Sequence, residues 1–386
     1  MSNFSTNINQ FIDSHCNKLF NSITGNSIEP TVSLCHHCHQ HVPAYAYETN
    51  GQYWLTKSCR LHGTSSHMIE RDYNFFSSLV YKKQYSSGGV MFEVSDRCNV
   101  ECPHCYHMPD NTIADKSIEQ LISELKQWYI RGTSLCMSGA EATLHRDFVE
   151  LIRQLSLTFP ESDVFVLTNG IRFADLEYFT ECKQAGLDGT MFGLNHPSYL
   201  DNPTIRKKQL QGISNAHTLG MQMNYIGYTM SSLSELTDIL DETTNSGWAP
   251  NMYRVRYGSD IGRYPNQERM YVSDIFNIVK QWCKDNGKRF EILDFDNNIY
   301  HVMVSIDDVP YRLIQWCDET DIHMEQLRTG PYCNFVPDGV TNFLHQVIRR
   351  DVWKNKKQQL PDLPPLRYQL TGAGDTSPLD FSKLYV

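Results

Sequence analysis

Apolar runs of strand length alternate with amphipathic stretches along the middle of the chain. The six apolar runs are VMFEVS, TSLCMS, DVFVLT, GTMFGLN, MNYIGYTM and MYRVRY, at residues 90–95, 133–138, 163–168, 189–195, 223–230 and 252–257. Six stretches with helical spacing follow them, at residues 117–130, 146–159, 173–186, 202–220, 231–247 and 272–287. Glycine, which favours the left-handed cap at a helix C-terminus, ends four of these stretches, at Gly186, Gly220, Gly247 and Gly287.

Six β-α units in series predict a parallel sheet covered by helices, which is either an open doubly wound sheet or a partial barrel. In both architectures the chemistry gathers at the carboxyl ends of the strands. Polar segments stand at four of these ends: DRCNVECPHCYH after the first strand, SGAEAT after the second, NG after the third and NHPSY after the fourth. We therefore expect these segments to share one edge of the sheet.

The rest of the chain divides around this series. Residues 1–32 are expected to form a helical lead-in that ends near Pro30, and residues 33–70 a small unit rich in cysteine and histidine. Residues 71–89 follow as a linker of helix and loop. The barrel then spans 90–290, and residues 291–386 are expected to form an irregular cap that covers the barrel mouth and contributes to the substrate region.

Composition narrows the class of protein. The chain has 386 residues, of which 40% are hydrophobic and 20% charged, as in soluble globular proteins. A net charge of −10 argues against a nucleic-acid partner. We expect neither a membrane span nor a signal peptide, because long apolar runs are missing. Half of the 12 cysteines fall in two tight groups, which favours metal binding in a reducing cytoplasm over disulfides.

The group after the first strand has the spacing C-x3-C-x2-C, formed by Cys98, Cys102 and Cys105. Three thiolates are one ligand short of a tetrahedral zinc site, which His104 or His107 could complete. Alternatively, three cysteines could bind three irons of a 4Fe–4S cluster, and the fourth iron would keep an open position.

The C-x3-C-x2-C loop after the first strand of a β-α series resembles the radical S-adenosylmethionine superfamily. This resemblance implies that the open iron binds the amino and carboxylate groups of S-adenosylmethionine. One electron, delivered by a donor such as flavodoxin or ferredoxin, then cleaves the cofactor, and the resulting 5′-deoxyadenosyl radical abstracts hydrogen from the substrate.

The segment MSGAEATLH after the second strand resembles the Gly-Gly-Glu-Pro motif of that superfamily, although the second Gly and the Pro are missing. The resemblance implies that Ser138, Gly139 and Glu141 face the ammonium group of the cofactor, to which a carboxylate makes a charge-assisted hydrogen bond. An ordinary βα turn with a solvated glutamate is the alternative.

Three further positions match the superfamily more loosely, and a fourth follows from the alternation of side chains along a strand. Tyr106 stands where an aromatic residue contacts adenine, and Asn169 and Asn195 stand where polar groups meet the cofactor. Arg254 and Arg256 share one strand face, and Arg256, nearer the carboxyl end, is the choice for a carboxylate of cofactor or substrate. The alternatives are a core tyrosine, turn asparagines and a solvated strand face.

The upstream group has two ligand pairs, Cys35-x2-Cys38 and Cys59-x2-His62, which predict a closed structural site for zinc or, less favoured, a mononuclear iron. Asn50-Gly51 between them is a strong hairpin signal. Three other histidines could replace a ligand: His37, His39 and His41. A small unit of this kind gains folding energy from its metal.

The metal unit followed by the three-cysteine loop resembles the radical enzymes grouped with archaeal tetraether lipid synthase. Those enzymes carry an additional cysteine-rich segment, whereas residues 71–89 contain no cysteine, so the lipid chemistry is not implied for this chain. Downstream, Cys283, Cys317 and Cys333 could hold an auxiliary cluster, or they could be small buried hydrophobic residues.

The sequence therefore predicts an α/β protein with a partial (β/α)6 barrel of TIM type and an N-terminal metal unit. The predicted activity is radical S-adenosylmethionine chemistry on a small-molecule or amino-acid-derived substrate, in natural-product or cofactor biosynthesis. Maturation of a ribosomal peptide is the enzymatic alternative. A non-catalytic iron–sulfur or zinc protein is the alternative from another class.

Overall fold

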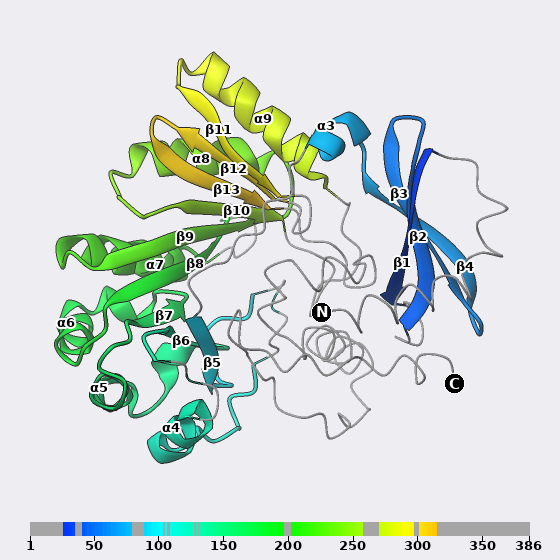
Figure 1. Ribbon diagram of the computed structural model, residues 1–386. Coiled ribbons are helices and arrows are strands. Elements are labelled where there is room, and N and C mark those ends of the chain that lie inside the picture. The colour runs from blue at the N-terminus through cyan, green and yellow to red at the C-terminus, as the bar shows by residue number, and fades with distance from the viewer. Residues whose placement is uncertain are drawn as a thin grey trace.

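Two β-sheets make up the framework of the chain in the computed structural model (Figure 1). The structure describes residues 26–34, 41–78, 89–102, 105, 109–126, 129, 131–196, 202–257, 270–296 and 301–314. The larger sheet has nine strands in the order β11-β12-β13-β10-β9-β8-β7-β6-β5, and the smaller has four in the order β1-β2-β3-β4. The predicted lead-in up to residue 25 and the predicted cap beyond residue 314 lie outside the described residues.

Six neighbouring strands of the larger sheet run parallel, as the apolar runs predict. They are β5 (Gly89–Ser95), β6 (Ser134–Gly139), β7 (Val164–Thr168), β8 (Gly189–Asn195), β9 (Gln222–Met230) and β10 (Tyr253–Tyr257). In the described part of the chain β5 and β11 form the two edges, so the sheet does not close. This is the arrangement of a partial (β/α)6 barrel.

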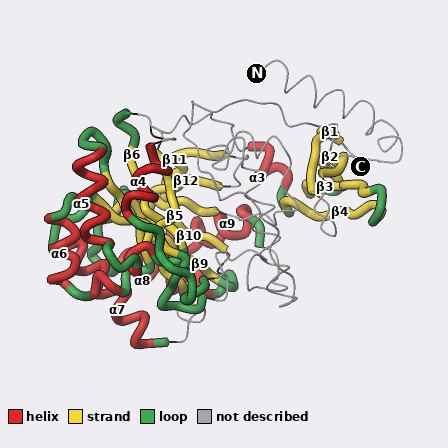
Figure 2. The backbone as a smooth tube through the Cα atoms, turned by 90° about the horizontal axis from the view of Figure 1, so that it is seen from below, coloured by secondary structure: helices red, strands yellow, loops and turns green. Residues whose placement is uncertain are grey.

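Helices follow these strands at the positions that the periodicity predicts. They are α4 (Ile118–Lys126), α5 (Phe148–Thr158), α6 (Leu176–Gln184), α7 (Pro203–Thr218), α8 (Glu235–Asn245) and α9 (Val272–Asp285), with short 3-10 turns η1 (Ala142–Leu144) and η2 (Arg172–Ala174). Figure 2 shows α5, α6 and α7 side by side on the outer side of the strands. All four predicted capping glycines have positive φ, between 60° and 110°.

The alternation of side chains gives each strand one helix-facing side and one opposite side. On β10 the hydroxyl of Tyr253 donates to the Thr243 carbonyl on α8, so Tyr253 and the buried Val255 face the helices. Arg254 and Arg256 therefore lie on the opposite side. We call this opposite side of the parallel strands the inner face.

Three strands, rather than an irregular cap, follow α9: β11 (Phe290–Asp296), β12 (His301–Ile306) and β13 (Val309–Ile314). The expectation of an irregular segment is wrong for residues 290–314. On β12, Val302, Val304 and Ile306 are buried with a period of two, which is the pattern of a half-buried strand. β13 pairs parallel with β10, and β12 and β11 continue the sheet antiparallel.

The N-terminal sheet is antiparallel and consists of β1 (Asn26–Leu34), β2 (His41–Thr49), β3 (Gln52–Cys59) and β4 (Gly63–Glu70). The predicted hairpin turn is confirmed, because Asn50 and Gly51 have φ of 52° and 76°. The helical expectation is wrong for residues 26–32, which form part of β1. Pro30 is tolerated there because β1 is an edge strand.

The end of β4 contacts α9, a helix that packs against the larger sheet (Figure 1). The Glu70 carboxylate, which is fully buried, accepts hydrogen bonds from the Ser273 hydroxyl and from the backbone N–H groups of Arg71 and Asp72. After the turn, α3 (Tyr73–Ser78) places the Phe75 ring 5.0 Å from that of Phe276. Burial raises the pKa of Glu70, and these hydrogen bonds oppose that rise.

Replacing Glu70 with Ala should therefore destabilise the folded chain. The substitution leaves buried backbone donors without an acceptor, which costs about 1–3 kcal/mol in the free energy of unfolding. Chemical denaturation of the purified protein measures the change. Glu150→Ala on the exposed surface of α5 is the matched control and should leave the midpoint almost unchanged. Equal midpoints for the two variants would contradict a linking role for Glu70.

Candidate functional site

The predicted site residues gather at the carboxyl ends of four consecutive strands. Cys98, Cys102 and Cys105 lie in the loop after β5. Three neighbouring strand ends provide the other groups: Ser138 and Gly139 at the end of β6, Asn169 directly after β7, and Asn195 as the last residue of β8. The structure therefore brings together segments that are up to 97 residues apart, from Cys98 to Asn195.

Both predicted asparagines contact the three-cysteine loop. The amide nitrogen Nδ2 of Asn195 donates to Sγ of Cys102 at 3.3 Å. Nδ2 of Asn169 lies 4.0 Å from Sγ of Cys98 and donates to Oδ1 of Asn99 at 2.8 Å. Hydrogen bonds to cysteine sulfur are among the features that set the reduction potential of an iron–sulfur cluster.

The chemistry of the cysteine loop fits a bound metal cluster. The pKa of Cys98 is raised to about 12, mainly by burial, with the nearby Glu141, Cys102 and Cys105 adding to the rise and the backbone N–H of Val100 opposing it. A free thiolate is therefore unfavourable at this position. Metal ions supply the positive charge that makes three adjacent thiolates stable, and they displace the protons as they bind.

An ion pair that sequence reasoning missed holds the start of this loop. Arg97 makes a two-pronged pair with the Asp115 carboxylate and also donates to the Leu144 carbonyl. The same carboxylate accepts from the Ser95 hydroxyl at 2.9 Å and from the Arg146 N–H at 3.1 Å. Burial alone would raise the pKa of Asp115, but these donors lower it below its usual value.

The backbone geometry at position 139 explains why the relaxed motif keeps a glycine there. Its φ is +125°, and a Cβ built there would lie 2.5 Å from the backbone oxygen of Ser95. The next residue, Ala140, donates its N–H to the same oxygen at 2.9 Å. The ends of β5 and β6 therefore approach so closely that only glycine fits at position 139.

Glu141 is buried, with 2% of its surface exposed, and it joins two strand ends. Its Oε1 accepts from the Thr143 N–H and hydroxyl and from the Thr168 hydroxyl, and Oε2 accepts from the Asn169 N–H at 2.7 Å. Burial raises the pKa of Glu141, and these donors oppose the rise. Oε2 receives one of the four bonds and so keeps acceptor capacity for a ligand.

Two other predicted positions make contacts within the protein. The Ser138 hydroxyl is buried and donates to the Phe92 carbonyl at 3.3 Å. Nε of Arg256 donates to the Thr229 hydroxyl at 2.8 Å. Thr229 pairs in register with Asn195 on one side and with Arg256 on the other, so Arg256 and Asn195 belong to the same row of the inner face. Tyr106, His104 and His107 lie outside the described residues.

One predicted ligand pair of the N-terminal unit has the geometry of a tetrahedral metal site. Sγ of Cys59 and Nδ1 of His62 are 3.4 Å apart. Zinc bonds of about 2.3 Å to sulfur and about 2.0 Å to nitrogen, at a tetrahedral angle, place these atoms about 3.5 Å apart. The donor pair therefore fits zinc. Cys35 and Cys38 lie outside the described residues. The same holds for the side chains of the histidines named as substitute ligands, His37, His39 and His41.

Cys283, one of the cysteines considered for an auxiliary cluster, is buried on α9. Burial raises its pKa to about 11, with the nearby Asp307 adding to the rise and Lys288 opposing it. It packs as part of the hydrophobic core. Cys317 and Cys333 lie outside the described residues, so their part in an auxiliary cluster stays a prediction.

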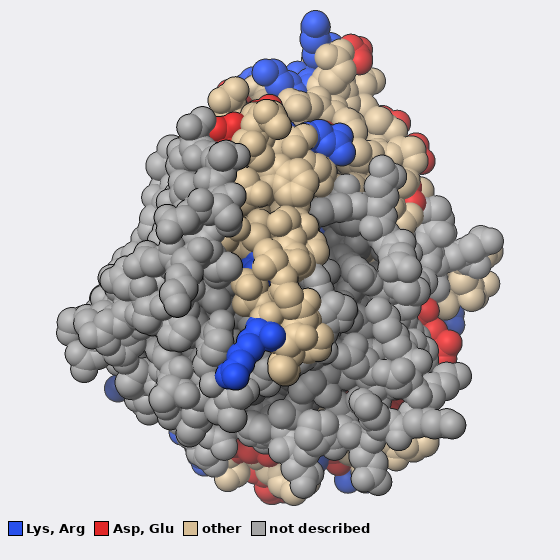
Figure 3. Space-filling model, turned by 90° about the vertical axis from the view of Figure 1, so that its right-hand side faces the viewer, with Lys and Arg blue, Asp and Glu red and all other residues tan. Residues whose placement is uncertain are grey.

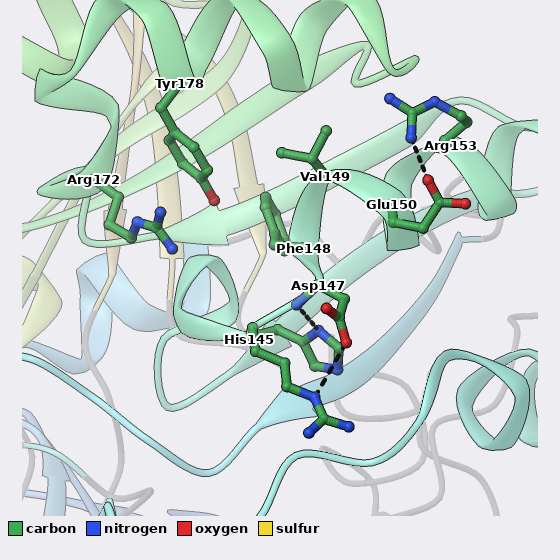
Figure 4. Close-up of a pocket in the computed structure, with 9 residues that line it drawn as sticks. His145, Asp147, Phe148, Val149, Glu150, Arg153, Arg172 and Tyr178 are labelled. Atoms are coloured by element: carbon green, nitrogen blue, oxygen red, sulfur yellow. Dashed lines mark hydrogen bonds and ion pairs between the residues drawn. The ribbon is translucent and has the colours of Figure 1, made fainter.

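A pocket of about 280 Å³ lies on the helix side of the sheet (Figure 4). Its charged groups pair with one another, as Arg153 does with Glu150 and Arg146 with Asp147. The guanidinium of Arg172 stacks over the Tyr178 ring at 4.0 Å. The predicted site residues do not line this pocket, so it is separate from the cysteine loop.

Comparison with known proteins agrees with both metal units. Residues 27–71 match the family model of the HMPTM N-terminal zinc ribbon domain, and residues 92–242 match that of the radical SAM superfamily. A 7,8-dihydro-6-hydroxymethylpterin dimethyltransferase of Methanocaldococcus jannaschii is 23% identical over 41% of this chain and 37% of its own length. A GTP 3′,8-cyclase of Limosilactobacillus fermentum is 23% identical over 54% of this chain and 65% of its own length.

Among solved structures, Streptococcus suis SuiB bound to S-adenosylmethionine aligns with a TM-score of 0.41 and 11% identity, over 64% of this chain and 53% of SuiB. The chain spans less than two thirds of the length of the two curated relatives named above.

Removing the Asp115 carboxylate should reduce metal binding by the cysteine loop. In Asp115→Ala, Arg97 loses its partner and the Ser95 hydroxyl and Arg146 N–H lose an acceptor, so the loop loses its fixed start. We expect at least a several-fold loss of iron and sulfide per chain after anaerobic reconstitution. Asp110→Ala removes an exposed carboxylate of the same loop and should bind as much iron as the unmodified chain. Equal iron contents in the two variants would refute this role of Asp115.

Proposed function

We propose that this chain is a radical S-adenosylmethionine enzyme whose cysteine loop holds a 4Fe–4S cluster, because residues 92–242 match the model of that superfamily. The contact that carries the proposal is that of Asn195 with Cys102, since it ties the end of β8 to the loop after β5. When bound, the cluster supplies one electron that cleaves S-adenosylmethionine to a 5′-deoxyadenosyl radical, which abstracts hydrogen from the substrate.

Each residue at the four strand ends receives a role in this proposal. Cys98, Cys102 and Cys105 bind three irons. The end of β6, with Ser138, Gly139 and Glu141, faces the ammonium group of the cofactor, and the acceptor capacity of Glu141 Oε2 supports this orientation. Polar groups for the rest of the cofactor come from Asn169, Asn195 and Arg256, and an aromatic face for adenine comes from Tyr106.

The proposed substrate is a small molecule or a derivative of an amino acid, in cofactor or natural-product biosynthesis. The names of the relatives support a small molecule, since they refer to a pterin and to GTP. The electron comes from a small redox protein such as flavodoxin or ferredoxin. Maturation of a ribosomal peptide is the enzymatic alternative, and no contact among the described residues favours it.

The N-terminal unit of residues 33–70 is proposed to bind zinc in a structural role. The separation of Cys59 and His62 and the match to a zinc ribbon favour zinc over a mononuclear iron. In Figure 3, which faces the side of this unit, the acidic side chains of described residues lie at the rim of the view.

The proposed location is a reducing cytoplasm. Four cysteines of the described residues are free thiols: Cys98, Cys136, Cys182 and Cys283. Within the same part of the chain, each helix is too short or too polar to cross a membrane.

Cleavage of the cofactor is the direct test of the proposed function. After anaerobic reconstitution with iron and sulfide, the brown protein should release 5′-deoxyadenosine from S-adenosylmethionine when dithionite is added. Cys102→Ala should abolish this release, because it removes one of three iron ligands. Cys182→Ala, which changes a buried cysteine of α6, should retain it. A colourless zinc protein that leaves the cofactor intact would instead be a non-catalytic metal protein.

The two metal units should lose their metals independently. Cys59→Ala should lower the zinc content and the yield and stability of the chain, while the iron of the soluble fraction and its cofactor cleavage are largely kept. Elemental analysis of zinc and iron per chain measures both sites in one sample. Soluble, folded preparations of Cys59→Ala and Cys102→Ala with equal loss of cleavage would contradict this division.

A further inference from the structure

Two glycines and two arginines form a continuous row across four neighbouring strands. The backbone register pairs Gly193 on β8 with Gly227 on β9, and Gly227 with Arg254 on β10. Arg254 in turn pairs with Arg312 on β13. Since paired residues of parallel strands point to the same side of a sheet, the two arginines stand next to each other, about 4.8 Å apart along the row.

This row lies on the inner face, the side that carries the proposed site. The hydroxyls of Tyr253 and Tyr311, each one residue before an arginine of the row, reach Thr243 on α8. The arginines therefore point away from the helices. Asn195, whose amide contacts Cys102, is two residues beyond Gly193 on the same strand and so shares this face.

Arg254 is held in place but its charge is not matched by the described residues. Its guanidinium lies over the Tyr225 ring at 4.5 Å, and the described part of the chain gives it neither an ion pair nor an acceptor for its buried Nε. Arg312 lies beside Arg254 in the same row. A buried donor without an acceptor, such as Nε of Arg254, is costly.

We propose that Arg254 and Arg312 form a subsite for an oxyanion of the substrate, either a phosphate ester or a carboxylate. The inference rests on the proposed function. Two planar guanidinium groups side by side offer several N–H donors to the oxygens of one such group, which is the geometry that arginine provides best. The anion would supply the acceptor that the described residues do not give to Nε of Arg254.

The glycine half of the row provides space beside the arginines. A Cβ built on Gly193 would have a single described neighbour within 4 Å, the Thr168 carbonyl oxygen at 3.9 Å. Arg254 is two strands and two residues from Asn195, which in a flat sheet amounts to about 12 Å. Beside Gly227 the space is bounded by the Tyr225 ring, 3.5 Å from a Cβ built there. A substrate anchored by its anion could therefore extend past this ring over Gly193 and present a carbon to the cysteine side of the inner face.

This subsite differs in place from the one assigned to the cofactor. Arg256, in the row of Asn195, is engaged with Thr229 and is nearer the carboxyl end of β10. Arg254 is two residues earlier on β10, and its guanidinium lies over the Tyr225 ring instead. Of the two arginines of β10, Arg256 is thus assigned to the cofactor and Arg254 to the substrate.

Binding of simple anions tests the subsite. The probes are inorganic phosphate and acetate, titrated into the reconstituted enzyme saturated with S-adenosylmethionine, so that the cofactor site and the open iron are blocked. An anion that binds the folded chain raises the midpoint of thermal unfolding in proportion to its affinity. Arg254→Gln and Arg312→Gln should each weaken this affinity about tenfold or more, and Arg254→Lys should weaken it less. Arg153→Gln, an exposed arginine of α5, is the control and should match the unmodified chain.

A shift with phosphate that depends on the arginines supports a phosphate-ester substrate, and one with acetate supports a carboxylate. Absence of a shift with both anions, or a shift that survives in both glutamine variants, overturns the subsite. Cofactor cleavage by the unmodified chain is measured in parallel. If cleavage occurs without an arginine-dependent shift, the subsite alone is wrong. If cleavage fails, the proposed function is wrong, whatever the anions do.

Discussion

The buried carboxylate of Glu141 is the interaction on which the arrangement of the site depends. Its bonds to Thr143, Thr168 and Asn169 fix the end of β6 against the end of β7. Asn169, held in this way through its backbone, reaches the cysteine loop with its side chain. A single carboxylate therefore sets the relative position of three of the four strand ends, and a carboxylate without these donors would not stay buried.

Charged residues are distributed unevenly between the two sides of the site. On the β5 to β8 side lie Glu141 and three cysteines, whose thiolates are stable when metal ions are bound. On the β10 and β13 side lie Arg254, Arg256 and Arg312. The glycines between them separate the two halves.

The sequence predicts the repeated part of this fold well and the exceptions poorly. The six strands and six helices follow from the alternation of apolar runs and amphipathic stretches, and parallel order then brings Cys98, Gly139, Asn169 and Asn195 to one edge. The strand at residues 26–34 was missed because its pairing with β2, a long-range contact, overrides local propensity. The three strands of residues 290–314 were missed because their period of two is short and lies among polar residues.

Whether a site residue could be identified from the sequence depends on how that residue comes to act in the site. Cysteines, Gly139 and the asparagines carry a spacing or a turn signal, so they could be identified directly. Asp115 acts by meeting Arg97, and nothing in its neighbourhood distinguishes it from an exposed aspartate. Arg312 could not be associated with Arg254 until β13 was known to pair with β10, because the two are 58 residues apart in an otherwise irregular stretch of sequence.

The N-terminal unit contacts α9, which packs on the helix side of the strands next to the arginine pair. Glu70 and Arg71 meet α9 through Ser273 and Asp274, and α9 packs against β12 and β13. β13 carries Arg312. A metal that stabilises the N-terminal sheet therefore supports the strand that completes the arginine pair, whereas the cysteine loop is held from β6, β7 and β8. With both metals bound as proposed, one would act on the folding of the N-terminal sheet and the other on the chemistry at the cysteine loop.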